Sequence, residues 1–431
     1  MKKIKYMLLA LTVFSAGQST AQSEVESIGV FTVGTDPMGD TGHFGSINGK
    51  SHQNDAILSH NGWQYTAYYN NESPRRIVMA RRKLPYGNWQ KFVFRDYAQT
   101  TNDGHNVICL GKSPEDGTLH MAFDHHGDHL NYRRSVTGLL DDPESKDWSA
   151  SRFGSVTDTL GDDTLTGVTY PIFVTSPSGK LYLSRRIGSP RDGDQLLYEY
   201  AGGAWTTIGK YIESDNHNAY MDNLYISPDA RMHAAWIWRN GPLPTAHDIC
   251  YAYSDDNGRT WYSSDGKKVG TTNEGAMSRL NNPELTVVPI SPGKLLNQQG
   301  MTVDAKGRPH IVHSLNNRVH HFYRDDKGKW HTIDCGFSRG GSRSSIAADA
   351  MNNVYIMFEG LQIAMATEDE NYTDWTIVNQ EFKGKYTSEP VFDRYRLKTS
   401  DILSVYMAEN NYRSIQVIDF LLNADTPPDT R

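Results

Sequence analysis

Cysteine is scarce in this chain, which has three in 431 residues: Cys109, Cys250 and Cys335. Three thiols cannot all pair, and their spacing does not resemble a disulfide scaffold. Basic charge is also in deficit, with 43 Lys and Arg against 50 Asp and Glu, which argues against nucleic acid as a partner. Long amphipathic helices are lacking, whereas β-rich stretches such as residues 63–69 and 180–184 recur. The sequence therefore predicts an all-β fold held by its core.

One long apolar run stands out, and it lies at the N-terminus. Lys2, Lys3 and Lys5 precede the apolar residues 7–14, and small and polar residues follow up to Gln22. This order is typical of a secretory signal peptide and unlike that of a buried helix, and the apolar part is too short to span a membrane. We predict removal of residues 1–22, which takes the net charge from −7 to −10. Residues 23–431 would then form one domain of a secreted or periplasmic, soluble monomer without membrane contact.

Six tryptophans recur at regular intervals: Trp89, Trp148, Trp205, Trp261, Trp330 and Trp375. Residues 254–261 read Ser-Asp-Asp-Asn-Gly-Arg-Thr-Trp and match the Asp-box S-x-D-x-G-x-T-W, which closes a hairpin between outer strands of a β-propeller blade. Weaker copies surround three of the other tryptophans. The intervals suit four-stranded blades with variable loops, so the chain is predicted to be a repeat protein.

Seven apolar runs upstream of these turns are predicted to be inner strands. They begin near residues 52, 103, 169, 217, 297, 341 and 388. We therefore expect a seven-bladed β-propeller of four-stranded antiparallel blades, in which each added blade lengthens the ring without enlarging one core. Residues 27–33 are expected to pair with residues 414–420, which would close the ring and hide both edges.

Polar side chains converge where the predicted inner strands begin. His, Asn, Tyr and Arg dominate these starts, which predicts a polar, cationic pocket near the axis. Three other histidines, His120, His233 and His310, recur at one repeat position and are interpreted as packed strand residues. His105 begins an inner strand, and His125 ends the second strand of the same blade. Adjacent strands could therefore bring His105 and His125 together.

Four segments carry a family resemblance. They are Asn-Asp-Gly-His-Asn at 102–106, Phe-Asp-His-His-Gly at 123–127, Gly-Val-Thr-Tyr-Pro at 167–171 and Leu-Ser-Arg-Arg at 183–186. Together they resemble the seven-bladed propeller ulvan lyases of marine bacteria, over most of the chain. That family uses two histidines, a tyrosine and an arginine, so the resemblance implies an active site made of His105, His125, Tyr170 and Arg186. Related propellers also include rhamnosidases, so the fold alone does not decide the reaction.

The implied reaction is β-elimination in ulvan, a sulfated rhamnose–uronic acid polymer, without a catalytic cofactor. Removal of the proton at C5 of a uronate requires neutralisation of the adjacent carboxylate, which Arg186 could supply. Tyr170 could act as base if a cationic pocket lowers its pKa, and could return the proton to the leaving oxygen. His105 and His125 could share either duty. The expected flanking contacts to substrate are Asn54, Asn106, His126, Arg185 and His217.

Two other functions compete with the lyase. One is a glycoside hydrolase, rhamnosidase-like or sialidase-like. An ordinary retaining or inverting glycosidase would need two carboxyl groups across the pocket, and Glu389 is the exception among the inner-strand starts, whereas a sialidase would use a tyrosine–glutamate pair and three arginines. The sialidase signature Phe/Tyr-Arg-Ile-Pro is absent, with residues 74–77 as the nearest approach. A non-catalytic propeller would instead stack sugars on Trp63, Tyr68 and Tyr220. Ultraviolet absorbance of an unsaturated uronate product separates these functions.

A structural zinc ion linking two blades is the remaining hypothesis. Cys250 and Cys335 lie in neighbouring repeats, with His233 close in sequence. Two thiolates and two imidazoles suit a closed tetrahedral site, although no C-x-x-C or H-x-x-x-H spacing links the candidate residues and free cysteines are often simply buried. We take His233, Cys250 and Cys335 as the candidate ligands, with the fourth unassigned.

Overall fold

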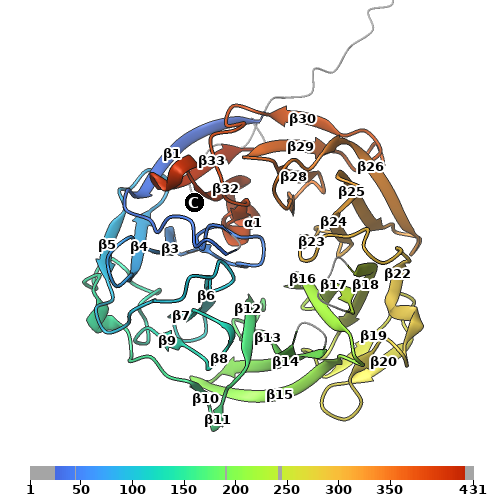
Figure 1. Cartoon of the computed structure of the whole chain (residues 1–431), viewed down its shortest axis with the longest axis horizontal. Helices are drawn as coiled ribbons and strands as arrows, with labels where there is room; N and C mark the ends of the chain where they lie inside the picture. The colour runs from blue at the N-terminus through green and yellow to red at the C-terminus, as the bar shows by residue number, and fades with distance from the viewer. Residues whose placement is uncertain (1–24, 44, 190–191, 241–244, 423–431) are drawn as a thin grey trace, which may run out of the picture.

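The chain forms a ring of antiparallel sheets around a central axis (Figure 1). The computed structural model describes residues 25–43, 45–189, 192–240 and 245–422, so the predicted signal peptide lies outside the described residues. Seven blades follow one another in chain order, as the sequence predicts. Within the described part of the chain, the helices are too short or too polar to cross a membrane.

The first three blades run from the inner strand outwards. Blade 1 contains β2 (Ile57–His60), β3 (Trp63–Tyr69), β4 (Ile77–Lys83) and β5 (Gln90–Val93). Blade 2 contains β6 (Ile108–Ser113), β7 (Thr118–Phe123) and β9 (Tyr132–Arg134). Blade 3 contains β12 (Val168–Thr175), β13 (Leu181–Ser189), β14 (Asp192–Ala201) and β15 (Ala204–Glu213), and β8 (His126–Asp128) adds to its inner edge. The small hairpin of β10 (Thr159–Leu160) and β11 (Asp163–Thr164) precedes blade 3.

The other four blades complete the ring. Blade 4 contains β16 (Asn218–Ile226), β17 (Met232–Arg239), β18 (Ala246–Ser254) and β19 (Thr260–Tyr262), extended by β20 (Lys268–Thr271) and β22 (Thr286–Val288), whereas β21 (Met277–Ser278) pairs with β15 of blade 3. Blade 5 contains β23 (Gly300–Val303), β24 (Pro309–Leu315), β25 (Arg318–Arg324) and β26 (Trp330–Ser338). Blade 6 contains β27 (Ser345–Ala348), β28 (Val354–Phe358), β29 (Gln362–Ala366) and β30 (Thr376–Asn379). Blade 7 contains β31 (Val391–Phe392), β32 (Ile402–Ala408), β33 (Ile415–Leu421) and β1 (Glu26–Gly34).

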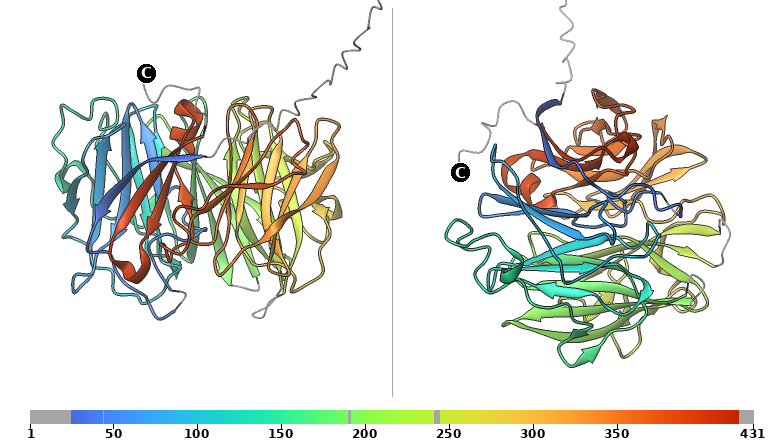
Figure 2. Two further views of the ribbon diagram at one scale, coloured as in Figure 1. Left: turned by 90° about the horizontal axis from the view of Figure 1, so that it is seen from above. Right: turned by 60° about the vertical axis from the view of Figure 1, so that its left-hand side comes forward.

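The hydrophobic core lies between successive blades. Strands β3, β6 and β7 are buried along their whole length because both faces of their sheets are covered by neighbouring blades. Trp236 of blade 4, for example, shares a cluster with Tyr182 and Tyr211 of blade 3. The side views in Figure 2 show the blades standing side by side around the axis. Each blade is therefore stabilised chiefly by its two neighbours.

Ring closure joins the two ends of the described chain. β1 pairs antiparallel with β33, which confirms the pairing expected from the sequence. Asp419 on β33 binds Arg82 of blade 1 at 2.8 Å and Arg396 at 2.6 Å, and all three side chains are buried. Arg396 belongs to the α-helix α1 (Arg394–Ser400), which begins after Asp393. One buried carboxylate thus links blade 7 to blade 1 and compensates two buried guanidinium groups.

The Asp-box has the structural role that the sequence predicts. Asp256 accepts hydrogen bonds from the backbone N–H groups of Arg259 (3.1 Å) and Thr260 (2.7 Å). Ser254 Oγ accepts one from Gly258 N at 2.9 Å, and the buried Trp261 indole donates to Gly258 O at 3.1 Å. These bonds close the turn between β18 and β19. The motif therefore belongs to the fold and takes no part in the central site.

Candidate functional site

The first candidate residue, Tyr170, has a strained backbone conformation. Tyr170 sits in β12 at a bulge between Thr169 and Ile172, and its φ is +51°. A side chain other than glycine rarely adopts this left-handed conformation, which costs on the order of 1–3 kcal/mol. The bulge lies next to the pairing of Thr169 with Arg186 on β13 and with His126 on β8. Neighbouring strands thus fix Tyr170, His126 and Arg186 around one point.

A carboxylate bridges two stacked histidines beside Tyr170. Asp103 Oδ1 lies 2.5 Å from His105 Nδ1, and Asp103 Oδ2 lies 2.7 Å from His126 Nδ1. The two imidazole rings stack with centroids 4.1 Å apart. Burial alone would raise the pKa of Asp103, but hydrogen bonds from His105 and His126 lower it to about 2. Asp103 is therefore an anion that holds Nδ1 of His105 and directs Nε2 away from itself.

His105 is neutral at neutral pH. Its side chain is 8% exposed, and burial together with the nearby His126 lowers its pKa to about 4, although Asp103 acts in the opposite direction. A neutral imidazole held in one orientation is equipped to accept a proton. His105 can therefore serve as a general base without first losing a proton.

Arg186 and Tyr170 lie against each other. The Arg186 guanidinium carbon is 4.9 Å from the centre of the Tyr170 ring and 5.5 Å from that of Tyr220. Arg186 is buried, yet its Nε and Nη1 have no hydrogen-bond partner among the described residues. Buried donors are normally paired, so this guanidinium is suited to receive an anionic ligand.

The pKa of Tyr170 is raised, contrary to the expectation that a cationic pocket lowers it. Burial of the phenol has the largest effect, and the positive charge of Arg186 offsets only part of it. The sequence shows that an arginine is near but does not show how much water the fold removes. A phenol with a raised pKa keeps its proton at neutral pH, which suits a general acid.

Several residues of this site were not assigned a role from the sequence. His52 lies 5.0 Å from the Tyr170 ring and 5.9 Å from the His105 ring, measured between centroids. Arg239 donates to the Tyr220 hydroxyl at 3.2 Å. His52 lies at the beginning of a predicted inner strand. Its position in the repeat was therefore the signal that could have assigned it to the site. Asp103 precedes His105 by two residues, a spacing that could have indicated a local hydrogen bond.

The structure joins His105 to His126 and places His125 elsewhere. His125 is buried, and its Nε2 accepts a hydrogen bond from Asn131 N at 2.8 Å. Burial and the nearby Arg185 lower the pKa of His125 to about 3. Adjacent residues at a strand end point in different directions. His126 therefore stacks on His105, whereas the His125 ring is bound to the backbone at Asn131.

The residues expected to flank the substrate fall into two groups. Asn106 and Arg185 are buried and bound within the protein, to Asp124 at 2.8 Å and to Thr166 O at 3.0 Å. Asn54 lines a small buried cavity near the axis. His126 and His217 are partly exposed. Of the five residues expected to flank the substrate, these two histidines are the ones that are not buried.

The structure separates the three residues expected to bind zinc, which corrects that hypothesis. His233 is paired across the sheet with Tyr253, and Cys250 is paired with Trp236. Because side chains alternate along a strand, His233 and Cys250 point to opposite faces of blade 4. Cys335 packs in the core between blades 5 and 6. The three side chains thus occupy three different spaces between blades, and His233 bonds to Tyr251 and Ser227.

One other group of side chains has donor atoms close together. Among the described residues, only His43, Asp103 and His105 place three such atoms within 4.8 Å of one another, as a metal ion would require. Asp103 and His105 already satisfy each other by a hydrogen bond. We therefore interpret this group as a hydrogen-bonded cluster of the candidate active site.

Known proteins resemble the chain in sequence and in fold. The ulvan lyase, long isoform, of Alteromonas sp. (strain LOR) is 23% identical over 402 residues, covering 74% of this chain and 38% of the relative. The short isoform from the same strain is 25% identical, covering 50% of this chain and 51% of the relative. The chain thus spans about two fifths of the length of the first relative.

Two solved structures share the fold over nearly the whole chain. The polysaccharide lyase Uly1 matches with a TM-score of 0.73 at 17% identity, covering 93% of this chain and 100% of that one. The PL25 ulvan lyase bound to -[GlcA(1-4)Rha3S]- matches with a TM-score of 0.65 at 14% identity, covering 91% and 95%. The model of the BNR repeat-containing family matches residues 63–337, which is more than half of the chain. The chain belongs to the BNR repeat-containing family.

Proposed function

We propose that the protein is a polysaccharide lyase that cleaves ulvan by β-elimination. The observation that carries the proposal is the buried Arg186 guanidinium, whose Nε and Nη1 have no hydrogen-bond partner among the described residues and which lies against the phenol of Tyr170. A uronate carboxylate would satisfy these donors. Named relatives are ulvan lyases, and the fold matches a lyase whose bound ligand contains glucuronate and sulfated rhamnose. Action on a polysaccharide fits the secreted or periplasmic location expected from the N-terminal sequence.

The pKa values favour one division of roles. Arg186 neutralises the carboxylate, so that the C5 proton becomes more acidic and the developing enolate is stabilised. His105, which is neutral, removes the C5 proton through Nε2 while Asp103 orients its ring. Tyr170, which is protonated, gives its proton to the glycosidic oxygen as the C4–O bond breaks. A C4–C5 double bond forms, and the proton on His105 returns to Tyr170 through solvent, so no cofactor is needed.

The same pKa values disfavour a hydrolase. A glycosidase needs one carboxyl group that stays protonated and a second that is ionised. Glu389 is buried, which would raise its pKa, but Arg343 at 2.9 Å, with Lys50, lowers it to about 2. Asp103 is held ionised by its two histidines. These two carboxyl groups are therefore unsuited to act as the general acid, which favours the lyase.

Incubation of the purified protein with ulvan is expected to generate ultraviolet absorbance from the unsaturated uronate. Reducing-end formation should rise in step with it, because each elimination creates one of each. Dialysis against EDTA should leave the rate unchanged, since His43, Asp103 and His105 are interpreted as a hydrogen-bonded cluster. Reducing ends without the absorbance would indicate a hydrolase, and neither signal would indicate a binding protein.

Replacement of His126 and of His125 by alanine should have different consequences. Burial and then His126 lower the pKa of His105, so His126→Ala should raise that pKa and move the acid limb of the kcat/KM profile to higher pH. His125→Ala should lower the unfolding midpoint, because it leaves a cavity and an unpaired Asn131 N–H, and should leave the acid limb in place. The profile and the melting temperature of both variants test this. A shifted limb in His125→Ala alone would return His125 to the active site.

A further inference from the structure

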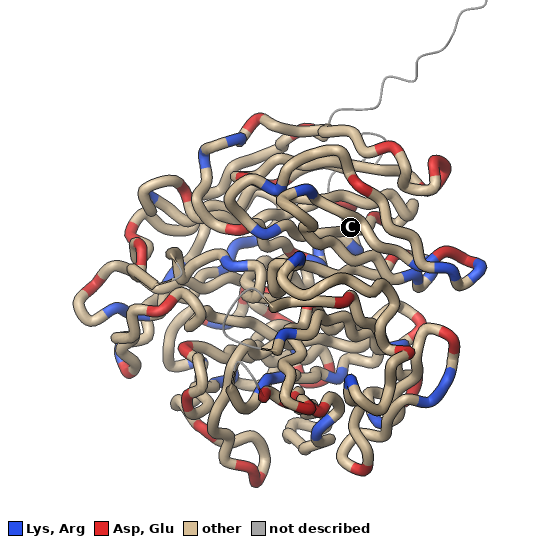
Figure 3. The backbone as a smooth tube through the Cα atoms, turned by 45° about the vertical axis from the view of Figure 1, so that its right-hand side comes forward, with Lys and Arg blue, Asp and Glu red and all other residues tan. Residues whose placement is uncertain are grey.

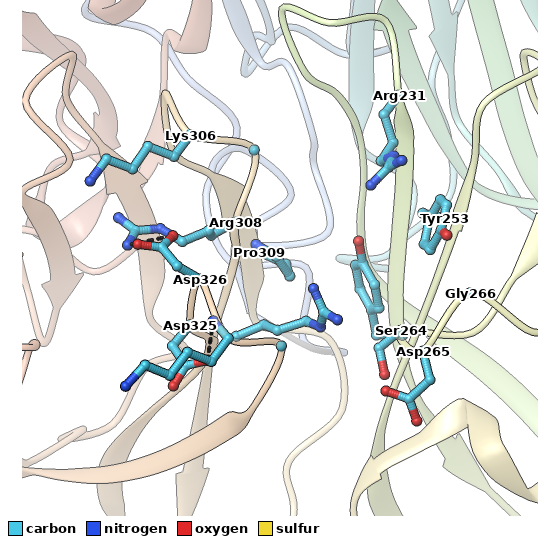
Figure 4. Close-up of a pocket in the computed structure, with 15 residues that line it drawn as sticks. Arg231, Tyr253, Ser264, Asp265, Gly266, Lys306, Arg308, Pro309, Asp325 and Asp326 are labelled. Carbon is cyan, nitrogen blue, oxygen red and sulfur yellow. Dashed lines mark hydrogen bonds and ion pairs between the residues drawn. The ribbon is translucent and has the colours of Figure 1, made fainter.

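A second charged cleft opens between blades 4 and 5. Its volume is about 600 Å³, and Figure 4 shows Arg231 and Tyr253 on one wall with Lys306 and Arg308 on the other. Five basic residues line it, Arg231, Lys306, Arg308, Arg324 and Lys327, against three acidic ones, Asp265, Asp325 and Asp326. The whole chain carries a net charge of −7, and acidic and basic positions are interspersed over the surface (Figure 3). The residues that line the cleft therefore include more basic than acidic side chains, in contrast to the chain as a whole.

The cleft lies on the face opposite the candidate active site. Arg231 directly precedes β17, whereas Arg239, which contacts Tyr220 of the active site, ends the same strand. Eight residues of extended chain span roughly 26 Å at about 3.3 Å per residue. The cleft and the active site therefore lie at opposite ends of blade 4. A ligand in one does not touch the other.

Three of the five cations already have partners. Arg231 binds Asp255 at 2.7 Å and lies 4.1 Å over the Tyr253 ring, which fixes its direction. Arg308 binds Asp304 at 2.6 Å and Glu368 at 2.8 Å. Lys306 also pairs with Glu368, at 2.5 Å. These pairs leave Arg324 and Lys327 as the cations able to bind a further anion.

Arg324 is held in place without an anionic partner. Among the described residues, Arg324 and Lys327 form no ion pair, and the buried Nε of Arg324 has no hydrogen-bond partner. The Arg324 guanidinium packs against the turn at Gly328, where a Cβ atom would lie 2.7 Å from Nη2. Gly328 also has a φ of +81°, a backbone conformation that favours glycine there. The turn thus keeps a half-buried, unpaired guanidinium at the cleft.

We propose that this cleft is a second binding site for an anionic saccharide, whose sulfate ester or carboxylate contacts Arg324 and Lys327. The saccharide class rests on the proposed function, since a polyanionic substrate would offer such groups along its length. Arginine and lysine side chains bind both anions by charge-assisted hydrogen bonds. A second contact on a long polymer would raise the local concentration of substrate without adding to catalysis.

The test measures retardation of the protein in native gels that contain ulvan, using the Tyr170→Phe background so that the polymer is not consumed. The double substitution Arg324→Gln and Lys327→Gln is expected to weaken binding roughly threefold to tenfold, in keeping with the loss of two partly exposed charge contacts. Lys329→Gln is the matched control, because Lys329 is exposed on the same turn but does not line the cleft. Equal retardation of the double variant and the parent would overturn the proposal, provided that both unfold at the same temperature.

Two modified polymers identify the bound group. If the sulfate ester is bound, desulfated ulvan should abolish the difference between the double variant and the parent. If the carboxylate is bound, carboxyl-reduced ulvan should abolish it. A difference that survives on ulvan that has been both desulfated and carboxyl-reduced shows that anions are not recognised and overturns the proposal.

Kinetics separate this proposal from the proposed function. With Tyr170 intact, the double variant should raise KM for ulvan and keep the parent turnover on a short ulvan oligosaccharide. A protein that does not cleave ulvan but shows the Arg324-dependent retardation would refute the lyase and keep the second site. If the protein cleaves ulvan but all variants are retarded equally, the second site is refuted and the lyase is kept.

Discussion

Replacement of Arg186 by alanine is expected to lower kcat on ulvan by about 10³-fold, the upper end of the loss seen when one group that stabilises a developing anion is removed. The reason is the second negative charge that forms when the C5 proton leaves beside an ionised carboxylate. Without the guanidinium, that charge is opposed by its neighbour. Initial rates of ultraviolet absorbance at saturating ulvan measure the effect.

The folded state should tolerate the loss of Arg186. Within the part of the chain that the structure describes, its Nε and Nη1 are buried without partners, which destabilises the fold. Arg186→Ala is therefore expected to unfold at a temperature close to that of the parent. Arg186→Lys is the informative companion, because lysine keeps the charge but loses the planar fork, and it should recover only part of the rate. Full activity in Arg186→Lys would refute a bidentate contact, and full activity in Arg186→Ala would refute the role itself.

The fold could be predicted because its signals are local and repeated. The turn at residues 254–261 closes through hydrogen bonds between near neighbours, so a short motif is enough to identify it. The pairing of β1 with β33 was also predictable, because a ring of blades must cover its two end strands. The seven short apolar runs, one more than the six tryptophans, indicated the number of blades.

The site was only partly predictable because it depends on the direction of individual side chains. His125 and His126 are adjacent in sequence, and only the bend after β7 decides which ring stacks on His105. The zinc hypothesis failed for a similar reason, since the sequence places His233 and Cys250 in one blade but does not show that they face opposite ways. The pKa of Tyr170 depends on how far the packed blades exclude water. Side-chain directions and pKa values of this kind depend on contacts between blades, which a short sequence motif does not contain.

Tyr170→Phe is expected to lower kcat by about 10²–10⁴-fold, the range for loss of a general acid or base. Phenylalanine keeps the ring beside Arg186 and the strained backbone, so the unfolding temperature should change little. A residual rate near that of the wild type would refute any proton transfer through Tyr170. A strong loss alone, however, fits an acid and a base equally well.

The pH dependence distinguishes the two roles of Tyr170. If Tyr170 is the acid, activity falls only when the phenol loses its proton, and its raised pKa places that alkaline limb above the ordinary tyrosine value. The acid limb then belongs to His105, and kcat/KM should fall as the pH drops towards about 4. If Tyr170 were the base, kcat/KM would instead climb through the alkaline range as the phenolate forms. An oligosaccharide with a nitrophenolate at C4 gives an independent result, because that leaving group needs no proton. It should restore most of the rate to Tyr170→Phe if Tyr170 is the acid, and none of it if Tyr170 removes the C5 proton.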